Sequence, residues 1–297
     1  MPATPAAFAC VAVTVLLWAA AFPAIRAALA AFPPAELAAL RFALASLILL
    51  PWLAWARPAL PRRADLPRIL AAGGLGIAGY NLLLNTGTQA VDAGTASFVV
   101  NTAPVFAALL GAALVGERLR PLGWVGIGLS LAGVALIAAG RGGLGFGGGA
   151  LLVLAAALCQ AAQFVLQKPL LARCGALPVT ACLIWAGTAM LLPFLPGALA
   201  AAAAAPAPAL GAAIFLGLGP AALAYVAWSY ALARLPVGRA AACLYLVPPL
   251  ATLLAWSWLG EAPGPGALAG GAVALAGVVL VNAIGRAPAP SSTAKGP

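Results

Sequence analysis

The stretch NTAPVFAALLGAALVGERLRPLGWVGIGLSLAG, residues 101–133, returns later in the chain as YLVPPLATLLAWSWLGEAPGPGALAGGAVALAG, residues 245–277. The two stretches align without a gap. Each position in the second lies 144 residues after its equivalent in the first, as Pro248 does after Pro104 (248 − 104 = 144). Self-similarity at a fixed spacing is the sequence signature of an internal repeat. The chain is therefore predicted to consist of two related halves.

The beginnings of the two halves are related at a slightly shorter spacing. Pro193 lies 142 residues after Pro51 (193 − 51 = 142). We place the first half at 1–144 and the second at 145–285. A tail rich in Pro, Ser and Ala follows at 286–297, and its composition predicts disorder.

The composition of the chain indicates lipid rather than water as the solvent. Of its 297 residues, 65% are apolar and 7% are charged, and the mean hydropathy is +1.10. A soluble domain is roughly 45–50% apolar and about 25% charged, so a water-soluble fold of this length would leave too much apolar surface exposed. The net charge of +10 is spread between apolar runs, which argues against nucleic-acid binding and is typical of membrane topology signals.

Ten segments are long and apolar enough to cross a bilayer, which takes roughly 20 residues per helix. They lie at 6–30, 35–55, 67–87, 94–115, 121–139, 148–168, 178–197, 209–232, 238–259 and 265–284. The fold class is therefore predicted to be all-α and integral to the membrane, with five transmembrane helices in each half.

An odd number of spans per half makes the second half enter the membrane from the side opposite to the first. If the N-terminus is cytoplasmic, all but three of the 15 basic residues fall on the cytoplasmic side, and the exceptions are Arg26, Arg41 and Arg141. This bias predicts both termini in the cytoplasm of a protein of the inner membrane. Inverted repeats are the architecture of alternating-access carriers, with substrate bound near the midplane between the halves. The alternative is that the duplication reflects only how the fold evolved and has no role in a transport cycle.

Four segments connect the chain to a known family. They are LLWAAAFPAIR at 16–26, LRFALA at 40–45, the stretch 101–135 with its Gly-Glu-Arg at 116–118, and the stretch 245–281 with its Gly-Glu at 260–261. In these segments, and over nearly its whole length, the chain resembles the EamA family of ten-helix permeases in the drug/metabolite transporter superfamily. The resemblance implies export of small metabolites, often amino acids, through a central cavity bounded by both halves.

Polar and aromatic side chains inside the predicted spans are the candidates for binding substrate, because polar groups in hydrocarbon are costly and normally face a cavity or a partner helix. Asn81 and Asn85 share one face of the third span, and the spacing of 144 makes Tyr225 and Ser229 their equivalents in the eighth. The full set is Trp18, Tyr80, Asn81, Asn85, Asn101, Gln160, Gln163, Tyr225, Trp228, Ser229 and Tyr245. Such a set can hydrogen-bond a small zwitterion against an aromatic wall; the alternative is that these groups only link helices.

Prolines inside the predicted spans are candidate hinges, namely Pro23, Pro104, Pro220 and Pro248. Proline removes a backbone donor and frees a carbonyl, which a membrane helix tolerates where a cavity, water or a neighbour satisfies it. The equivalence of Pro104 and Pro248 suggests matching hinges in the two halves. Kinks that serve only packing are the alternative.

Few charged residues remain for ion coupling. Glu117 and Glu261 directly follow spans, where we expect a structural salt link or a helix-end role rather than proton coupling. Glu36 and Arg41, near the start of the second span, are candidates to pair with Arg26 at the outer surface. With no histidine and no acidic residue at a predicted midplane, the sequence favours facilitated diffusion or weak coupling.

The main functional prediction is a secondary transporter that exports small metabolites, above all amino acids, and works in contact with lipid. Export of drugs, nucleosides or sugar derivatives is an alternative, and so is a passive channel or a structural membrane protein. An enzyme is disfavoured because the sequence offers no nucleophile–base pair, paired carboxylates or metal set, and no cofactor is expected. The GxxxG spacing of Gly266 and Gly270 allows a homodimer or close helix contact, and we expect contact with the fifth span of the same chain.

Overall fold

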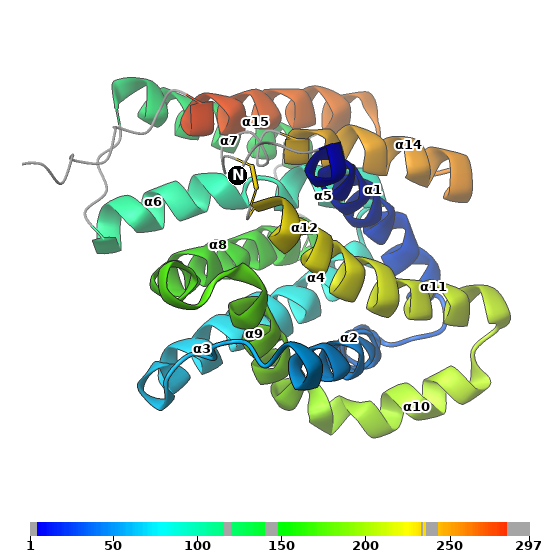
Figure 1. Cartoon of the computed structure of the whole chain (residues 1–297). Coiled ribbons are helices and arrows are strands. Elements are labelled where there is room, and N and C mark those ends of the chain that lie inside the picture. Colours follow the sequence, from blue (N-terminus) through cyan, green and yellow to red (C-terminus); the bar gives the residue numbers. More distant parts are fainter. Residues whose placement is uncertain (1–4, 116–119, 140–147, 233, 236–242, 284–297) are drawn as a thin grey trace, which may run out of the picture.

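The computed structural model describes residues 5–115, 120–139, 148–232, 234–235 and 243–283, and these residues form helices without strands (Figure 1). The helices of the first half are α1 (Pro5–Ala28), α2 (Pro34–Ala56), α3 (Leu66–Gly73), α4 (Tyr80–Thr88), α5 (Ala93–Val100), α6 (Ala103–Val115) and α7 (Pro121–Ala139). Those of the second half are α8 (Gly148–Cys174), α9 (Ala176–Leu191), α10 (Leu195–Ala204), α11 (Ala207–Leu218), α12 (Ala224–Leu232), α14 (Val247–Leu259) and α15 (Pro265–Ala283).

Most of these helices combine into segments that can cross a membrane. By length and composition, seven segments qualify: Pro5–Ala28, Pro34–Ala56, Arg63–Thr88, Ala93–Ala113, Gly148–Cys174, Ala176–Ala204 and Ala207–Ala231. Three shorter apolar helices lie at Pro121–Ile137, Leu244–Leu259 and Pro265–Val281. Each of these segments overlaps one of the spans predicted from the sequence.

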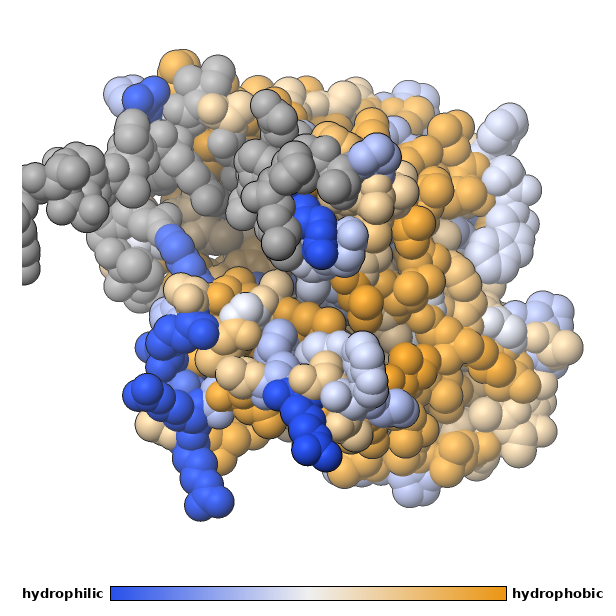
Figure 2. All heavy atoms as spheres, in the orientation of Figure 1, coloured by the Kyte–Doolittle hydropathy of each residue, from blue (hydrophilic) through white to orange (hydrophobic). Residues whose placement is uncertain are grey.

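The outer surface of the helix bundle is apolar. Figure 2 shows a broad hydrophobic face, with hydrophilic side chains gathered mostly toward the left of the view. Large apolar side chains on this surface include Trp55, Trp256 and Leu47, which are 85%, 63% and 61% exposed. A soluble monomer rarely exposes so much contiguous apolar surface, so the fold is that of an integral, multi-pass membrane protein.

Two of the predicted spans are interrupted by π-helical segments at equivalent places. The third span contains the segment Gly74–Gly79 and the eighth contains Gly219–Leu223, and their first residues are 145 apart (219 − 74 = 145). The sequence predicted a continuous helix in the third span, whereas Pro220 marked a candidate hinge in the eighth. Pro220 explains one interruption, because its ring excludes the normal backbone hydrogen bond. Short π-helical segments inside α-helices frequently lie at functional sites.

The fourth predicted span is also not a single helix. Asn101 and Thr102 form a turn between α5 and α6, and Pro104 follows in the first turn of α6. Pro248 likewise lies in the first turn of α14, directly after a 3₁₀ turn. A proline costs little there, because the first N–H groups of a helix have no intrahelical partner. Pro23, in contrast, lies inside the unbroken helix α1.

Helices α7 and α15 pack closely through glycines. A Cβ atom on Gly126 would lie 2.9 Å from the carbonyl oxygen of Gly277, and one on Gly133 would lie 2.5 Å from that of Gly270. Because the contacting residue numbers rise along α7 and fall along α15, the two helices are antiparallel. The second contact repeats the first at a spacing of 144 with the roles exchanged (270 − 126 = 277 − 133 = 144). Reciprocal contacts of this kind are what a two-fold axis between two copies produces.

A second reciprocal contact lies between the remaining helices. Gly73 of α3 packs on the carbonyl oxygen of Leu183 in α9, and Gly217 of α11 packs on the carbonyl oxygen of Arg41 in α2. The residues of the two contacts are equivalent, because 217 − 73 = 144 and 183 − 41 = 142. The same local packing therefore occurs once in each direction between the halves.

The contact between α2 and α9 includes one pair of equivalent residues that touch each other. The hydroxyls of Ser46 and Thr188, 142 residues apart, lie 2.8 Å from one another. Beside them, Thr188 donates to the carbonyl oxygen of Phe42 at 3.2 Å, and Trp185 donates to that of Ser46 at 3.3 Å. Contact between equivalent residues is expected only close to an axis that relates the two halves.

Some sequence predictions fall outside the described residues. They concern the charges at Glu117 and Arg118, the outer position of Arg141, the beginning of the ninth span and the disorder of the tail at 286–297.

Candidate functional site

A charged side chain lies inside the helix bundle, on the second helix. Arg41 of α2 is only 7% exposed, and its Nη1 donates a hydrogen bond of 3.0 Å to Oδ1 of Asn81 in α4. The amide nitrogen of Asn81 in turn donates to the carbonyl oxygen of Ile77, in the π-helical segment, at 2.8 Å. The prediction that Arg41 lies at the outer surface near Glu36 and Arg26 is therefore wrong. Its side chain instead packs inward and bonds to a predicted site residue.

Two tyrosines complete the surroundings of this arginine. Tyr80 and Tyr225 both lie within the range of Coulombic interaction with the Arg41 guanidinium and with each other. We call Arg41, Tyr80, Asn81 and Tyr225 the Arg41 cluster. Tyr225 lies 144 residues after Asn81 (225 − 81 = 144), the spacing of the predicted repeat.

An aromatic group adjoins the cluster. The ring of Trp18 in α1 meets that of Tyr225 edge-on at 5.6 Å between centroids, and that of Trp228 at 5.7 Å. The indole nitrogen of Trp18 donates to the carbonyl oxygen of Pro220 at 3.3 Å. That carbonyl belongs to the second π-helical segment, where regular helical hydrogen bonds are lost. The structure thus brings together three of the predicted aromatic residues, and Tyr225 belongs to both groups.

Gln163 packs directly against the first π-helical segment. It is 6% exposed on α8, and a Cβ atom on Gly76 would overlap its side chain. Gly76 is therefore one of the residues that let α8 approach the third span so closely. Gln160 is half-buried on the same helix, one turn earlier.

The other predicted site residues do not join the Arg41 cluster. Asn85 is fully buried but donates to the carbonyl oxygen of Pro34, at the start of α2, at 3.0 Å. Asn101 donates within its own turn, to the carbonyl oxygen of Ser97 at 2.8 Å. Tyr245 packs with the apolar residues between α6, α7 and α15. Ser229 is buried one turn after Tyr225, on the same helix.

Two ion pairs connect the halves at opposite ends of the bundle. Arg26 bonds to Glu261 at 2.9 Å and also donates to the carbonyl oxygen of Thr88. Arg173 bonds to Asp65 at 2.6 Å. Asp65 and Thr88 lie near the two ends of one candidate span of 26 residues. At 1.5 Å of rise per residue the two ion pairs are thus roughly 35 Å apart along the bundle. Glu261 therefore forms the structural salt link that the sequence suggested.

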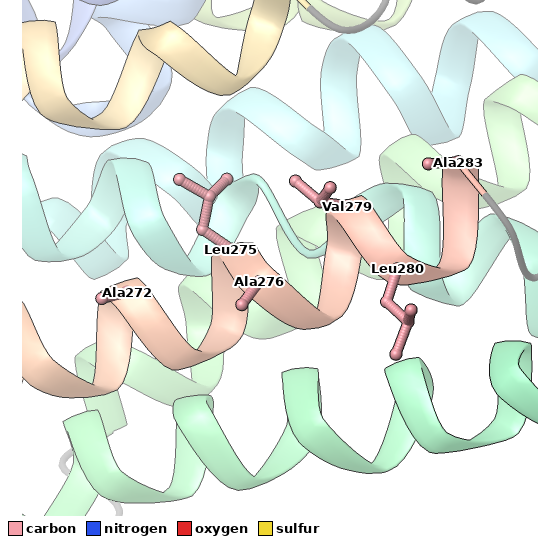
Figure 3. A pocket seen from close by; sticks show the side chains of 6 residues that line it. All are labelled: Ala272, Leu275, Ala276, Val279, Leu280 and Ala283. Atoms are coloured by element: carbon pink, nitrogen blue, oxygen red, sulfur yellow. The ribbon is translucent and has the colours of Figure 1, made fainter.

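An open hollow on the surface of α15 lacks the chemistry of a polar binding site. Figure 3 shows its lining, which consists of Ala272, Leu275, Ala276, Val279, Leu280 and Ala283. Alanine, leucine and valine offer nothing to hydrogen-bond a metabolite, whereas they suit lipid chains. Among the described residues, no group of three or more His, Cys, Asp or Glu side chains could hold a metal ion.

The residue that sequence reasoning missed is Arg41, and a signal for it existed. It interrupts the apolar helix α2 about two turns after the helix begins, and a charge within a span is by default a candidate for function. Because Arg41 lies near the end of the predicted span, its sequence position is equally compatible with a side chain at the membrane surface and one buried in the bundle. Only the packing of α2 against α4 and α11 placed it inside.

Comparison with known proteins identifies relatives over most of the chain. The model of the EamA-like transporter family matches residues 6–139 and again residues 147–283. A protein of Streptantibioticus cattleyicolor named "Probable terminal-alkyne amino-acid exporter" is 43% identical over 91% of both chains. The "Uncharacterized transporter YdfC" of Bacillus subtilis is 38% identical over 88% of this chain and 86% of its own.

Two more distant matches are a protein named as an efflux pump and a solved structure with a similar fold. A Salmonella typhimurium protein named "Probable amino-acid metabolite efflux pump" is 28% identical over 90% of this chain and 91% of its own. One solved crystal structure of a protein superposes with a TM-score of 0.62, covering 92% of this chain and 95% of its own at 24% identity. That likeness establishes a shared fold.

Proposed function

The chain belongs to the EamA-like transporter family, and from this we propose that it exports amino acids or closely related small metabolites by alternating access. The family and the relatives are transporters and not enzymes. The observation that carries the proposal is the Arg41 cluster, which both halves build together. A binding group shared by two halves can be exposed to one side of the membrane or the other when the halves rock against each other.

The architecture we propose is two inverted five-helix repeats, with both termini in the cytoplasm. Three observations support it: the antiparallel contact of α7 with α15, the reciprocal contacts at Gly73 and Gly217, and the touching equivalents Ser46 and Thr188. Each is the contact expected at a pseudo-two-fold axis in the membrane plane. The family model, which matches the chain twice, is consistent with the boundary at 144–145.

Amino acids are the favoured substrate class for two reasons. One relative is named as a probable terminal-alkyne amino-acid exporter and another as a probable amino-acid metabolite efflux pump. The site itself combines a cation, an amide and phenol groups with an aromatic wall, which suits a small molecule that has both charged and apolar parts. Drugs, nucleosides and sugar derivatives would use the wall but not the cation.

The two ion pairs are the proposed closures of this cycle. One pair holds the halves together at each end of the bundle, as Arg26–Glu261 and Asp65–Arg173 do. Alternating access needs one end to open while the other stays shut, so the pairs would break in turn.

Counterflow in proteoliposomes tests the proposal. Vesicles loaded with unlabelled neutral amino acids, nucleosides or sugars would be diluted, at equal pH, into the corresponding labelled compound. We expect saturable uptake for amino acids, lost in Asn81→Ala and retained in Thr86→Ala, whose side chain is exposed one turn further along the chain. Uptake restricted to another class of compound would overturn the proposal that amino acids are the substrates. Flux without counterflow would indicate a channel.

A further inference from the structure

Arg41 is a buried cation without a carboxylate partner among the described residues. Its Nε makes no hydrogen bond there, and its Nη1 is bonded only to a neutral amide. The chain has five acidic residues. Three of them are bonded elsewhere: Glu261 with Arg26, Asp65 with Arg173, and Asp92 with the start of α5. The side chain of Glu36 lies next to Gly197 of α10. The fifth, Glu117, lies outside the described residues. A buried charge without a partner is costly.

The fold does not require a cation at this position. The equivalent residue of the second half is Leu183 (183 − 41 = 142), which is fully buried and makes the same backbone contact with a glycine as Arg41 does. Apolar packing therefore satisfies the position structurally. At this position the first half has the positive charge of Arg41, and the second half has an uncharged leucine.

We propose that Arg41 binds the carboxylate of the transported molecule, with the hydroxyl groups of Tyr80 and Tyr225 beside it. Guanidinium and carboxylate match in geometry and can form two parallel hydrogen bonds, and Nε is a buried donor that has no partner in the protein. The substrate class is then defined by a free carboxylate, and an analogue with a carboxamide in its place is rejected. This assignment rests on the proposed function and deepens it.

The first test compares a carboxylate with its amide in the wild-type protein. Purified full-length protein in proteoliposomes would exchange labelled L-leucine in the presence of unlabelled L-leucine or L-leucinamide. We expect the amide to compete at least tenfold more weakly, because a site built for an ionic group rejects the analogue that lacks it. Equal competition by the two compounds would overturn the proposal.

The second test removes or occupies the cation. Arg41→Gln should raise the half-saturating concentration of leucine at least tenfold and abolish the discrimination against leucinamide, and Arg41→Lys should restore part of both. Asn81→Asp should block exchange, because the new carboxylate pairs with Arg41 inside the protein. Arg68→Gln, an exposed arginine at the start of α3, is the matched control and should behave as wild type. Full discrimination in Arg41→Gln would contradict the proposal.

Failure of the two proposals can be told apart. If no amino acid exchanges but another carboxylic acid does, and its amide does not, the substrate proposal falls and the role of Arg41 stands. If amino acids exchange as well as their amides do, the substrate proposal stands and the role of Arg41 falls. Should Arg41→Gln not fold, the wild-type comparison and Arg41→Lys still decide.

Discussion

Some residues in this bundle serve packing and others are proposed to bind substrate, and Gly76 and Gln163 illustrate packing. An amide on an apolar helix was expected to face a cavity. The Gln163 side chain packs against Gly76 of the third span, which has no side chain to displace it. The close approach joins α8 of the second half to the π-helical segment of the first, whose carbonyl at Ile77 is bonded by Asn81. Packing at Gly76 therefore influences the position of the Arg41 cluster.

Gly76→Ala is the residue-scale prediction. The added methyl group would overlap Gln163, so we expect a loss of stability of about 1–3 kcal/mol, the usual cost of overpacking, together with impaired exchange. The measurement is thermal unfolding in detergent and leucine counterflow. The double variant Gly76→Ala with Gln163→Ala should recover only part of the stability, since it removes the amide group but keeps the Cβ of residue 163, which lies 2.5 Å from the new methyl group. Gly211→Ala, with open space around the glycine, should be neutral, and equal damage at both glycines would contradict the explanation.

At the scale of elements, the helices are irregular where the two halves meet the site. Each half has a π-helical segment in its third span and an interruption directly before a proline in its fourth. Both features release backbone carbonyls, and the carbonyl of Pro220 is taken up by Trp18. Regular helices would need no such side-chain partners. The irregular segments therefore tie the backbone to the polar and aromatic groups that we assign to the site.

The packing of α7 on α15 provides the element-scale prediction. Gly133→Ala would press a methyl group into the backbone of α15, which cannot move aside as a side chain can. We expect it to destabilise the protein by about 1–3 kcal/mol, seen as a lower unfolding temperature. Gly128→Ala on the same helix, where nothing lies within 4 Å of the new group, is the matched control. Comparable melting of the two variants would mean that these helices do not pack as described.

At the scale of the whole molecule, the informative feature is that an ion pair lies at each end of the bundle, Arg26–Glu261 at one end and Asp65–Arg173 at the other. If they are closures of an alternating cycle, weakening one must favour opening at its own end and closing at the other, because the halves move as bodies. A purely structural salt bridge would have only a local effect. This difference makes the mechanism measurable without knowledge of the substrate.

Glu261→Gln and Asp65→Asn should therefore have opposite effects. The reporters are a cysteine at Ala93→Cys, whose backbone N–H bonds to Glu261 at 3.1 Å, and the native Cys174 next to Arg173, in a protein without the other cysteines. Glu261→Gln should increase thiol labelling several-fold at the first and reduce it at the second, and Asp65→Asn should do the reverse. Increases confined to the altered end would refute coupling between the ends.

Much of this protein follows from the sequence by itself. Apolar length predicts which segments can cross a bilayer, because the membrane thickness sets the number of residues. The repeat at a spacing of 144 predicted which glycines and polar residues are equivalent, and the family was recognised on local motifs. These are properties of segments and spacings along the chain. Pro104 and Pro220 marked candidate hinges near the break at Asn101 and in the eighth span, but the break inside the third span was not predicted, since it depends on neighbours that satisfy the released carbonyls.

Only the tertiary structure decided which candidates meet. Asn81 bonds to Arg41 and Trp18 contacts Tyr225, whereas Asn101 and Tyr245, equally polar and equally matched by the repeat, face elsewhere. The burial of Arg41 could also be established only from the tertiary structure. Near the end of a span, one charge can reach the surface or turn inward, and the sequence does not distinguish the two. The packing of α2 against α4 and α11 buries the guanidinium and gives it an amide partner. Asn81 of α4 is 40 residues away in the chain, and α11 begins 166 residues away (207 − 41 = 166).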